Sequence, residues 1–414
     1  MKGRSLFVPT VVMLILSISW TTANEPADVS AVLTSSSSRA AYLARATIWR
    51  DPEPLSPNQI LAGPVGIFPY TFTEATADPG IGCIFTKPGE YLGGETPKFL
   101  CTTITDRHLL RVKYWDPELQ SGNREVFATV AASRLMWALG FETFHALPLN
   151  MRCDGCPKNP MTGEGAQRLR LYLAVLQEFS SWPVILSRHD RDQGWSWREL
   201  DDAIKGLPSG PERIRQRTHF DALTLLGVFL QHGDRKPEQQ ALYCDAPIDL
   251  AAGQTQAWDK SEGPSMLVES PGASACAHAV AMVIDLGATF GGAGRTSRMG
   301  TATMNLDAWR SKPVFKDSEN GTCHGRLTVS LSAGSDGEGD PMISEEGRRF
   351  LLEQLQRLSP AHLRAIFAAA RSDNVRGPSK AAVDGGNSTA IDGWVAAFQD
   401  KVRQINTQRC QPAS

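Results

Sequence analysis

The chain has 414 residues, of which 42 are basic and 44 acidic, and 42% are hydrophobic. This composition excludes a disordered acidic or basic tail and is sufficient for a sizeable core. The formal net charge of −2 gives no reason to expect nucleic acid as a partner. At this length we expect two or three lobes.

The N-terminal residues predict export. Two basic residues precede an apolar run from Leu6 to Trp20, and small residues up to Ala23 suit cleavage by a signal peptidase. The alternative is an uncleaved anchor, but the run is shorter than the roughly 20 residues of a spanning helix and contains Pro9. We therefore predict a signal peptide over residues 1–23, no transmembrane segment after its cleavage, and a secreted, periplasmic or secretory-pathway location.

Export makes disulfides permissible, and the eight cysteines allow up to four bridges. Their connectivity does not follow from the sequence. Cys153 and Cys156 have the CxxC spacing of a local disulfide, of a zinc half-site or of a redox motif. A zinc site would need a second close pair, and the one candidate, Cys323-His324, is adjacent rather than spaced. A local disulfide is therefore the favoured interpretation, with the other two left open.

Residues 24–60 are rich in Ser, Ala, Pro and Thr, and this composition predicts a flexible leader. From residue 61 to residue 115, Gly, Pro and Thr separate short runs of β-type residues. We predict that these runs form a small antiparallel sheet. They span residues 82–86, 98–103 and 109–115.

Helical spacing of apolar residues begins at Glu125 and continues to Leu139, and Gly140 suits a left-handed C-terminal cap. Two further β runs, at 146–151 and 167–178, come before a long stretch in which the helical pattern dominates. The helices expected there span residues 213–231, 344–358, 361–371 and 388–405, the third with Ser359 as N-cap and Pro360 as first residue.

This order of elements predicts an α+β fold with two lobes. The N-terminal lobe would span residues 61–178 and hold the small β-sheet with one helix. The C-terminal lobe would span residues 179–414 and be mainly helical. The near-zero net charge is consistent with a site whose few essential charges are local.

Two acidic motifs follow apolar segments of the chain. Gly233-Asp234-Arg235 lies in a compact polar turn after the long helix, and Asp285-Leu286-Gly287 follows a buried-strand pattern. A carboxylate at the end of an apolar strand or turn is costly unless it faces a cleft or a cation. A divalent metal is the natural cation for this pair.

These motifs resemble the Gly-Asp-Arg-His…Asn and Asp-Phe-Gly pair of phosphatidylinositol kinases and their atypical-kinase relatives, which include HipA-like toxin kinases and kinases of the secretory pathway. The resemblance implies a protein-kinase-like fold, ATP as substrate, and Mg²⁺ or Mn²⁺. It implies that Asp234 orients or deprotonates an acceptor hydroxyl and that Asp285 binds the metal that bridges the phosphates. Gln239 stands where the family has Asn, and it would be the second metal ligand.

The other pieces of this family occur upstream in the expected order. Lys113 lies in an apolar β run, as does the strand lysine that binds the nucleotide phosphates. Glu125 opens the next helix, as does the glutamate that pairs with that lysine. Gly93 and Gly94 precede Lys113 in a hairpin where a phosphate-covering loop belongs, and they would bring backbone N–H groups close to an anion.

The chain departs from the family pattern in three ways. Gln239 is one methylene longer than Asn, so its oxygen or its backbone must shift to hold an octahedral Mg²⁺. The two Asp residues, 234 and 285, are unusually far apart, so residues 245–275 must loop out, and Cys244 and Cys276 would staple this insert. No Gly-x-Gly-x-x-Gly run is present. The resemblance covers about residues 85–375 and is specific only within 233–239 and 284–287.

Three functional hypotheses follow. The first is a secreted kinase that transfers a phosphoryl group from ATP to a hydroxyl of a protein, lipid, sugar or small molecule. The second is a noncatalytic kinase-like binding module, a pseudokinase, which is favoured by Gln239 and by the scarcity of ATP outside bacterial cells. The third is a zinc-dependent exported enzyme that uses Cys153 and Cys156. Taken singly, each Asp also has a structural explanation, as a turn residue or a salt-bridge partner.

Overall fold

The structure is a computed structural model. It describes residues 31–34, 36–86, 96–115, 124–160, 163–177, 184–187, 194–245, 255–256, 266–268, 276, 278–291, 303–316, 321–328, 340–374 and 390–411. The predicted signal peptide, residues 1–23, lies outside these residues, as do Gly93 and Gly94. Within the described part, none of the helices combines the length and apolar character needed to cross a membrane.

The chain has a mixed α+β architecture in which five strands close into a barrel, in the order β2-β3-β4-β6-β5. The strands are β2 (Ile81–Thr86), β3 (Lys98–Thr103), β4 (Leu109–Tyr114), β5 (Ala146–Asn159) and β6 (Glu164–Gln177). The expected antiparallel sheet is therefore a barrel, which the parallel pair β2 and β5 closes. Closure leaves no free edge on this sheet.

Strands β3 and β4 present two chemically different faces. Phe99 and Val112 alternate inward and belong to the barrel core. The opposite parity places Lys98 and Lys113 directly opposite each other in the strand register. This second face carries the basic residues of the candidate site.

A second sheet has the strand order β11-β8-β7-β1-β10-β9. Its strands are β1 (Ala31–Thr34), β7 (Val184–Ser187), β8 (Gln240–Cys244), β9 (Thr255–Gln256), β10 (Met266–Val268) and β11 (Ala279–Val283). β1 lies between β7 and β10 and runs parallel to both. β9 and β10 belong to the insert expected at 245–275, of which the remainder lies largely outside the described residues.

Helix α4 (Glu125–Leu139) has the bounds predicted from its apolar spacing. Gly140 ends it in the left-handed conformation, with φ of 80°. A Cβ at Gly140 would collide with the carbonyl oxygen of Arg50, so only glycine fits this cap. α4 is buried on nearly all sides because it packs against β5 and β6 of the barrel and against helix α9.

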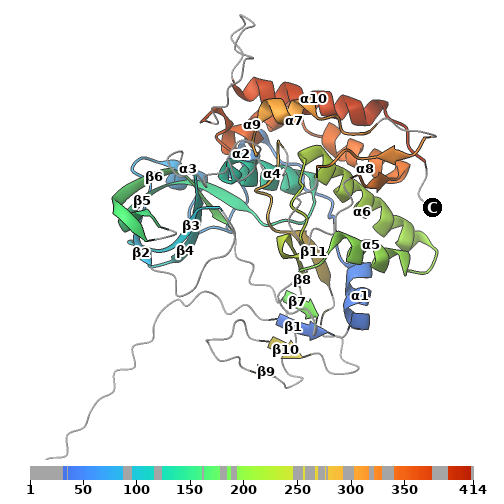
Figure 1. Ribbon diagram of the computed structural model, residues 1–414, viewed down its shortest axis with the longest axis horizontal. Coiled ribbons are helices and arrows are strands. Elements are labelled where there is room, and N and C mark those ends of the chain that lie inside the picture. The colour runs from blue at the N-terminus through green and yellow to red at the C-terminus, as the bar shows by residue number, and fades with distance from the viewer. Residues whose placement is uncertain are drawn as a thin grey trace, which may run out of the picture.

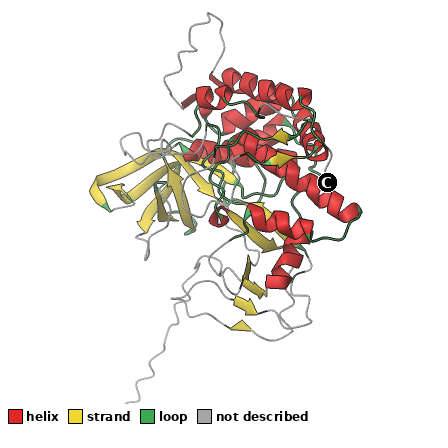
Figure 2. Cartoon of the chain, turned by 45° about the vertical axis from the view of Figure 1, so that its right-hand side comes forward, coloured by secondary structure: helices red, strands yellow, loops and turns green. Residues whose placement is uncertain are grey.

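The remaining helices form a mainly helical region beside the barrel (Figure 1). They are α5 (Trp197–Lys205), α6 (Pro211–Leu230), α7 (Leu306–Ser311), α8 (Glu345–Gln356), α9 (Pro360–Ala369) and α10 (Ala390–Thr407). The predicted cap of α9 is confirmed, since the Ser359 side chain accepts a hydrogen bond from the His362 N–H. Figure 2 shows the helices gathered on one side and the barrel strands on the other.

The prediction of a flexible leader is wrong for residues 36–60. This segment forms helix α1 (Ser36–Arg45) and helix α2 (Pro57–Ala62), followed by the short helix α3 (Phe72–Thr76). Leu43 and Ile48 are buried in the main core, and Arg39 forms an ion pair with Glu199 of α5 at 2.7 Å. The composition of this segment did not indicate an ordered structure, because its few apolar residues are buried by residues far away in the chain.

All eight cysteines form disulfides. The pairs are Cys83–Cys101, Cys153–Cys156, Cys244–Cys276 and Cys323–Cys410. The expected staple between Cys244 and Cys276 is confirmed. Cys153 and Cys156 are joined to each other, so the zinc hypothesis for these two residues is wrong, because a disulfide offers no thiolate.

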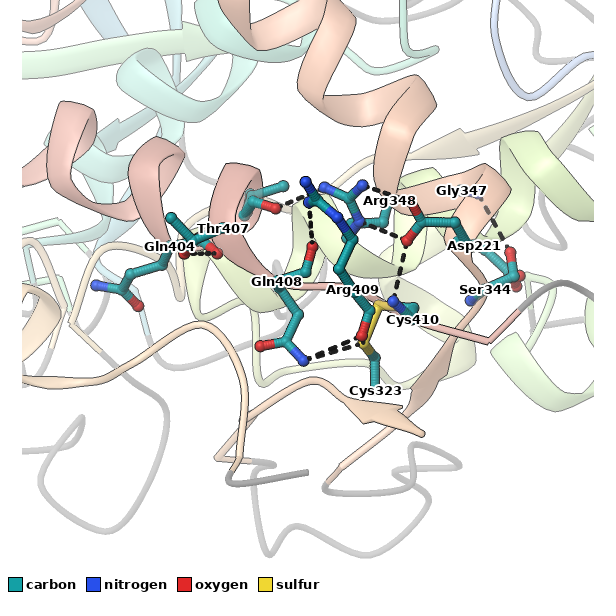
Figure 3. Close-up of a disulfide and its surroundings, with 12 residues drawn as sticks. Asp221, Cys323, Ser344, Gly347, Arg348, Gln404, Thr407, Gln408, Arg409 and Cys410 are labelled. Atoms are coloured by element: carbon teal, nitrogen blue, oxygen red, sulfur yellow. Dashed lines mark hydrogen bonds and ion pairs between the residues drawn. A yellow bond between two sulfur atoms is a disulfide. The ribbon is translucent and has the colours of Figure 1, made fainter. Parts of the chain in front are cut away.

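The Cys323–Cys410 bridge fastens the segment after α10 to the short strand β12 (Cys323–His324), which pairs with β13 (Met342–Ile343). Figure 3 shows Gln408 beside the bridge, where its Nε2 donates to Cys323 Sγ at 3.4 Å and to the Arg409 carbonyl. The backbone N–H of Cys410 also donates to Glu345 of α8 at 3.0 Å. The C-terminal segment is thus held by covalent and polar contacts together.

Candidate active site

The centre of the candidate site is an ion pair between the barrel and the second sheet. Lys113 Nζ, from β4, lies 3.1 Å from Asp285 Oδ2, two residues after the end of β11. The backbone N–H of Gly287 donates to Asp285 Oδ1 at 3.0 Å. Burial alone would raise the pKa of Asp285, but the Lys113 ammonium and the Gly287 N–H together lower it below its ordinary value. Asp285 is therefore a carboxylate at neutral pH.

Glu125, the first residue of α4, completes this group. Its Oε2 accepts a hydrogen bond from Thr96 Oγ1. Burial and the negative charge of Asp285 raise the pKa of Glu125, while Lys113 opposes the rise. A Cβ on Gly287 would lie 2.9 Å from Glu125 Oε2, so the glycine of the Asp285-Leu286-Gly287 motif permits the close approach to α4.

Asp234 lies in the turn that follows α6. The turn begins where Gln231 ends the helix with φ of 57°, and it runs into a short 3-10 helix, η1 (Pro237–Gln239). Gln239 Nε2 donates to Asp234 Oδ2 at 3.4 Å, and Lys236 Nζ lies 3.5 Å from Asp234 Oδ1. Burial raises the pKa of Asp234, and the nearby Asp285 adds to the rise, whereas Lys236 opposes it.

The backbone brings the two acidic motifs together although they are 51 residues apart in the chain, at 234 and 285. The Gln239 carbonyl accepts hydrogen bonds from the N–H groups of Ile284, at 2.9 Å, and Asp285, at 3.3 Å. Strands β8 and β11 continue this contact as an antiparallel pair. The Cys244–Cys276 bridge joins the far ends of the two strands, so the insert leaves their near ends undisturbed.

Arg235 and His232 anchor this turn in the core. The Arg235 guanidinium lies 3.6 Å from the ring centroid of Trp197, and burial lowers its pKa to about 9. His232 is also buried, and burial together with Arg235 lowers its pKa to about 4. Its ring nitrogens have no hydrogen-bond partner among the residues that the structure describes. His232 is therefore neutral at physiological pH.

Two basic residues of the site, Lys98 and Arg111, do not stand out in the sequence. Lys98 of β3 is buried opposite Lys113, and burial, with the positive charges of Lys113 and Arg111, lowers its pKa to about 8. Arg111 lies two residues before Lys113 and so on the same face of β4. Burial lowers the pKa of Arg111, while Asp285 opposes the fall. The alternation of side chains along β4 could have identified Arg111 as a residue on the same face as Lys113. Lys98 could be placed on that face only by knowing which residues of β3 and β4 pair with each other.

The structure thus brings Lys113, Glu125 and Asp285 together. The turn with Asp234 and Gln239 lies beside this group, because the Gln239 carbonyl accepts hydrogen bonds from the N–H groups of Ile284 and Asp285. Gly93 and Gly94 lie outside the described residues.

The donor set suits a metal that is bound together with a nucleotide. Within the described part of the chain, no group of three or more His, Cys, Asp or Glu could form an all-protein metal site. Mg²⁺ commonly uses one or two carboxylates with substrate phosphates and water. Asp285 and the carboxamide of Gln239, whose segments meet at the Gln239 carbonyl, fit that pattern.

Comparisons with known proteins found similarity at the level of structure. No protein-family model matches the chain, and no curated protein sequence matches it significantly. Among solved structures, the chain is similar to the Helicobacter pylori proinflammatory kinase CtkA, with a TM-score of 0.39 and 11% sequence identity. The likeness covers 79% of this chain and 96% of CtkA.

Proposed function

We propose that this chain is a kinase-like phosphotransferase that moves the γ-phosphoryl group of ATP, with Mg²⁺ or Mn²⁺, to an acceptor hydroxyl. The observation that carries the proposal is the Lys113–Asp285 ion pair, with Glu125 beside it and the Asp234 turn joined to it by the backbone. In this proposal the barrel and α4 act as the N-terminal lobe, the helical region acts as the C-terminal lobe, and the nucleotide lies between them.

Each residue has a distinct role in the proposed reaction. Lys113 neutralises the phosphates, and Glu125 fixes the position of the lysine. Asp285 and Gln239 would hold the divalent cation, which when bound offsets the negative charge of the phosphates. Because phosphoryl transfer depends almost wholly on positioning and electrostatic stabilisation, these charges account for most of the expected rate enhancement.

Asp234 is the proposed proton acceptor. The acceptor oxygen forms a bond to the γ-phosphorus, the bond from that phosphorus to the β–γ bridging oxygen breaks, and ADP leaves with the electron pair. The proton of the hydroxyl passes to Asp234. Burial and Asp285 raise the pKa of Asp234, which makes its carboxylate a stronger base than an exposed Asp. The acceptor would be a hydroxyl of a protein, a lipid or a small molecule.

The alternative is a noncatalytic kinase-like module, and one contact favours it. The Gln239 amide donates to Asp234 Oδ2, so the residue expected on the metal is hydrogen-bonded to the residue expected to act as base. In that case the chain would bind nucleotide without turning it over.

The four disulfides support an oxidising compartment for either activity, as the signal peptide predicted over residues 1–23 does. We therefore place the proposed kinase outside the cytoplasm, in a periplasm, a secretory lumen or the secreted fraction.

Calorimetry with Mn²⁺ and ATP tests the proposal. Wild-type protein should bind the nucleotide, and Asp285→Asn should weaken binding at least about tenfold, because a charge-assisted contact contributes about 1.5–3 kcal/mol. Asp392→Asn is the matched control, since Asp392 forms a surface ion pair with Arg364 on the helical region. No binding by the wild type, or equal binding by Asp285→Asn, would refute the proposal. Formation of ADP in the presence of Mn²⁺ then separates a kinase from the noncatalytic module.

A further inference from the structure

Arg134, in the middle of α4, has unusually few partners for a buried cation. Its side chain is completely buried, and its Nη2 donates a hydrogen bond of 3.3 Å to the Ala62 carbonyl at the end of α2. Its Nε and Nη1 have no hydrogen-bond partner in the described part of the chain. Burial lowers the pKa of Arg134 to about 10, so the guanidinium is still charged at neutral pH. A buried charge with a single long hydrogen bond is costly to the fold.

Other buried arginines of this protein have the partners that Arg134 lacks. Arg39 forms an ion pair with Glu199 at 2.7 Å and donates to two backbone carbonyls. Arg348 forms an ion pair with Glu345 at 2.6 Å and donates to a backbone carbonyl at 2.7 Å. Over the ranges that the structure describes, Arg134 forms no ion pair with a carboxylate. Its charge is therefore not balanced in the way that the other two are.

The neighbours of Arg134 make room for the guanidinium but do not neutralise it. A Cβ on Gly63 would collide with the guanidinium carbon and both terminal nitrogens, so a glycine is required where α2 ends. His145 interacts electrostatically with Arg134, and burial together with that positive charge lowers the pKa of His145 to about 4. An imidazole is either neutral or positive, so His145 cannot supply the missing negative charge.

We propose that Arg134 is the anchor of a buried site for one chloride ion. The ion would balance the guanidinium charge and accept charge-assisted hydrogen bonds from Nε and Nη1. A monovalent anion suits a single guanidinium, because a divalent one would leave the core with a net negative charge. A helix has about 3.6 residues per turn, so Arg134, nine residues after Glu125, lies on the face of α4 opposite the candidate active site. The chloride site is thus independent of the proposed function.

A helix cap is the competing explanation for Arg134. Arginine side chains stabilise helix C-termini by donating to the last carbonyls, as Arg134 does at Ala62. In that role water would satisfy Nε and Nη1, and the stability of the protein would not depend on which anion is present. A chloride site instead predicts stabilisation that is specific to the ion and requires the guanidinium.

Thermal unfolding in sodium chloride and in sodium gluconate of equal ionic strength tests the proposal, because gluconate is too large for a buried site of this kind. A ligand that binds only the folded state raises the melting temperature, and we expect a rise of about 2–4 °C for wild type in about 0.3 M chloride. Arg134→Met should show no such rise. The control Arg45→Met should keep it, since Arg45 also donates to one backbone carbonyl, that of Ala41 at 3.2 Å, but is exposed.

Diffraction from wild-type crystals grown in sodium bromide locates the ion directly. We expect an anomalous bromide peak in hydrogen-bond contact with the Arg134 guanidinium, and this measurement decides the matter even if Arg134→Met does not fold. The absence of that peak would overturn the proposal, as would a wild-type melting temperature that is equal in the two salts. An equal chloride effect in wild type and folded Arg134→Met would also overturn it. A bromide peak without any chloride effect on stability would mark an adventitious ion only.

Discussion

The barrel and the helical region are stabilised by different interactions. The barrel core is small, and two disulfides, Cys83–Cys101 and Cys153–Cys156, lie within it. The helical region instead buries a cluster of aromatic rings around Phe290, whose ring centroid lies 5.1 Å from that of Trp309 and 5.8 Å from that of Phe367. A small core supplies little hydrophobic stabilisation, and the two disulfides add to it, whereas the Cys323–Cys410 bridge of the helical region lies beside a much larger core.

The same division extends to the candidate site. The barrel contributes the cations Lys98, Arg111 and Lys113, whereas Asp234 and Asp285 come from segments attached to the helical region. Neither part contains a complete site. We therefore expect substitutions of the barrel cations to alter mainly nucleotide binding. Substitutions in the turn that carries Asp234 should alter mainly the chemical step.

The largest expected effect concerns Asp234. Asp234→Asn should lower the rate of phosphoryl transfer by about 10²- to 10⁴-fold, since a general base contributes that much, while ATP affinity changes by less than about threefold. Single-turnover assays with radiolabelled ATP measure the rate, and calorimetry measures the affinity. Asp392→Asn is again the surface control. A variant that retains its rate, or that loses ATP binding instead, would contradict the division between binding and chemistry.

The disulfides should differ in the stability they provide. Cys323 and Cys410 are 87 residues apart, and the entropy of the closed loop predicts a loss of about 4–5 kcal/mol when both are replaced by Ala. Cys83 and Cys101 are 18 residues apart, so the same change there should cost about 3 kcal/mol. Urea unfolding followed separately by barrel and helical probes measures both. A larger loss from the barrel pair would mean that its small core depends on the bridge more than loop entropy requires.

His232 should make the stability of the protein depend on pH. Its pKa is lowered from 6.5 to about 4 in the folded protein, so the unfolded state binds a proton that the folded state does not. Stability therefore falls as pH drops below about 6.5, by at most about 3 kcal/mol at pH 4. His232→Phe should remove this loss and leave stability at pH 7 within about 1 kcal/mol.

Denaturation of both proteins between pH 4 and pH 7 measures the difference. His324→Gln, at the exposed residue of β12, is the control. Parallel stability curves for wild type and His232→Phe would show that other groups cause the acid sensitivity.

The smallest expected effect concerns Arg235. Arg235→Lys should destabilise the protein by about 1 kcal/mol, because an ammonium does not stack on the Trp197 ring as a planar guanidinium does. Thermal unfolding measures the change, and the barrel variant Arg107→Lys provides an exposed arginine for comparison. An increase in stability would indicate that the cost of burying Arg235 exceeds the gain from stacking.

Local patterns predicted α4, α6, α8, α9 and α10, but they did not predict α5 or α7. α4 and α9 have the predicted positions because their start and stop signals lie within a few residues of the helix, such as Gly140 and the Ser359-Pro360 cap. The segment over residues 36–60 was mispredicted because Leu43 and Ile48 are buried by elements far along the chain. Composition contains no information about such distant partners.

The candidate site shows the same limit. Asp234, Asp285, Lys113 and Glu125 could be selected from residue type, order and the ends of predicted elements. Lys98 could not, because its place beside Lys113 depends on which residues of β3 and β4 face each other. A shift of one residue in that register would turn Lys98 to the other face of the barrel.

The position of β1 has a consequence for the order of assembly. β1 (Ala31–Thr34) is inserted between β7 (Val184–Ser187) and β10 (Met266–Val268), and it is parallel to both. During synthesis, this strand meets its first partner only after about 150 further residues have emerged, and its second partner later still. Contacts over such sequence distances form slowly, whereas β3 and β4 pair with each other across a short turn. The earliest described segment of the chain is thus one of the last to pair.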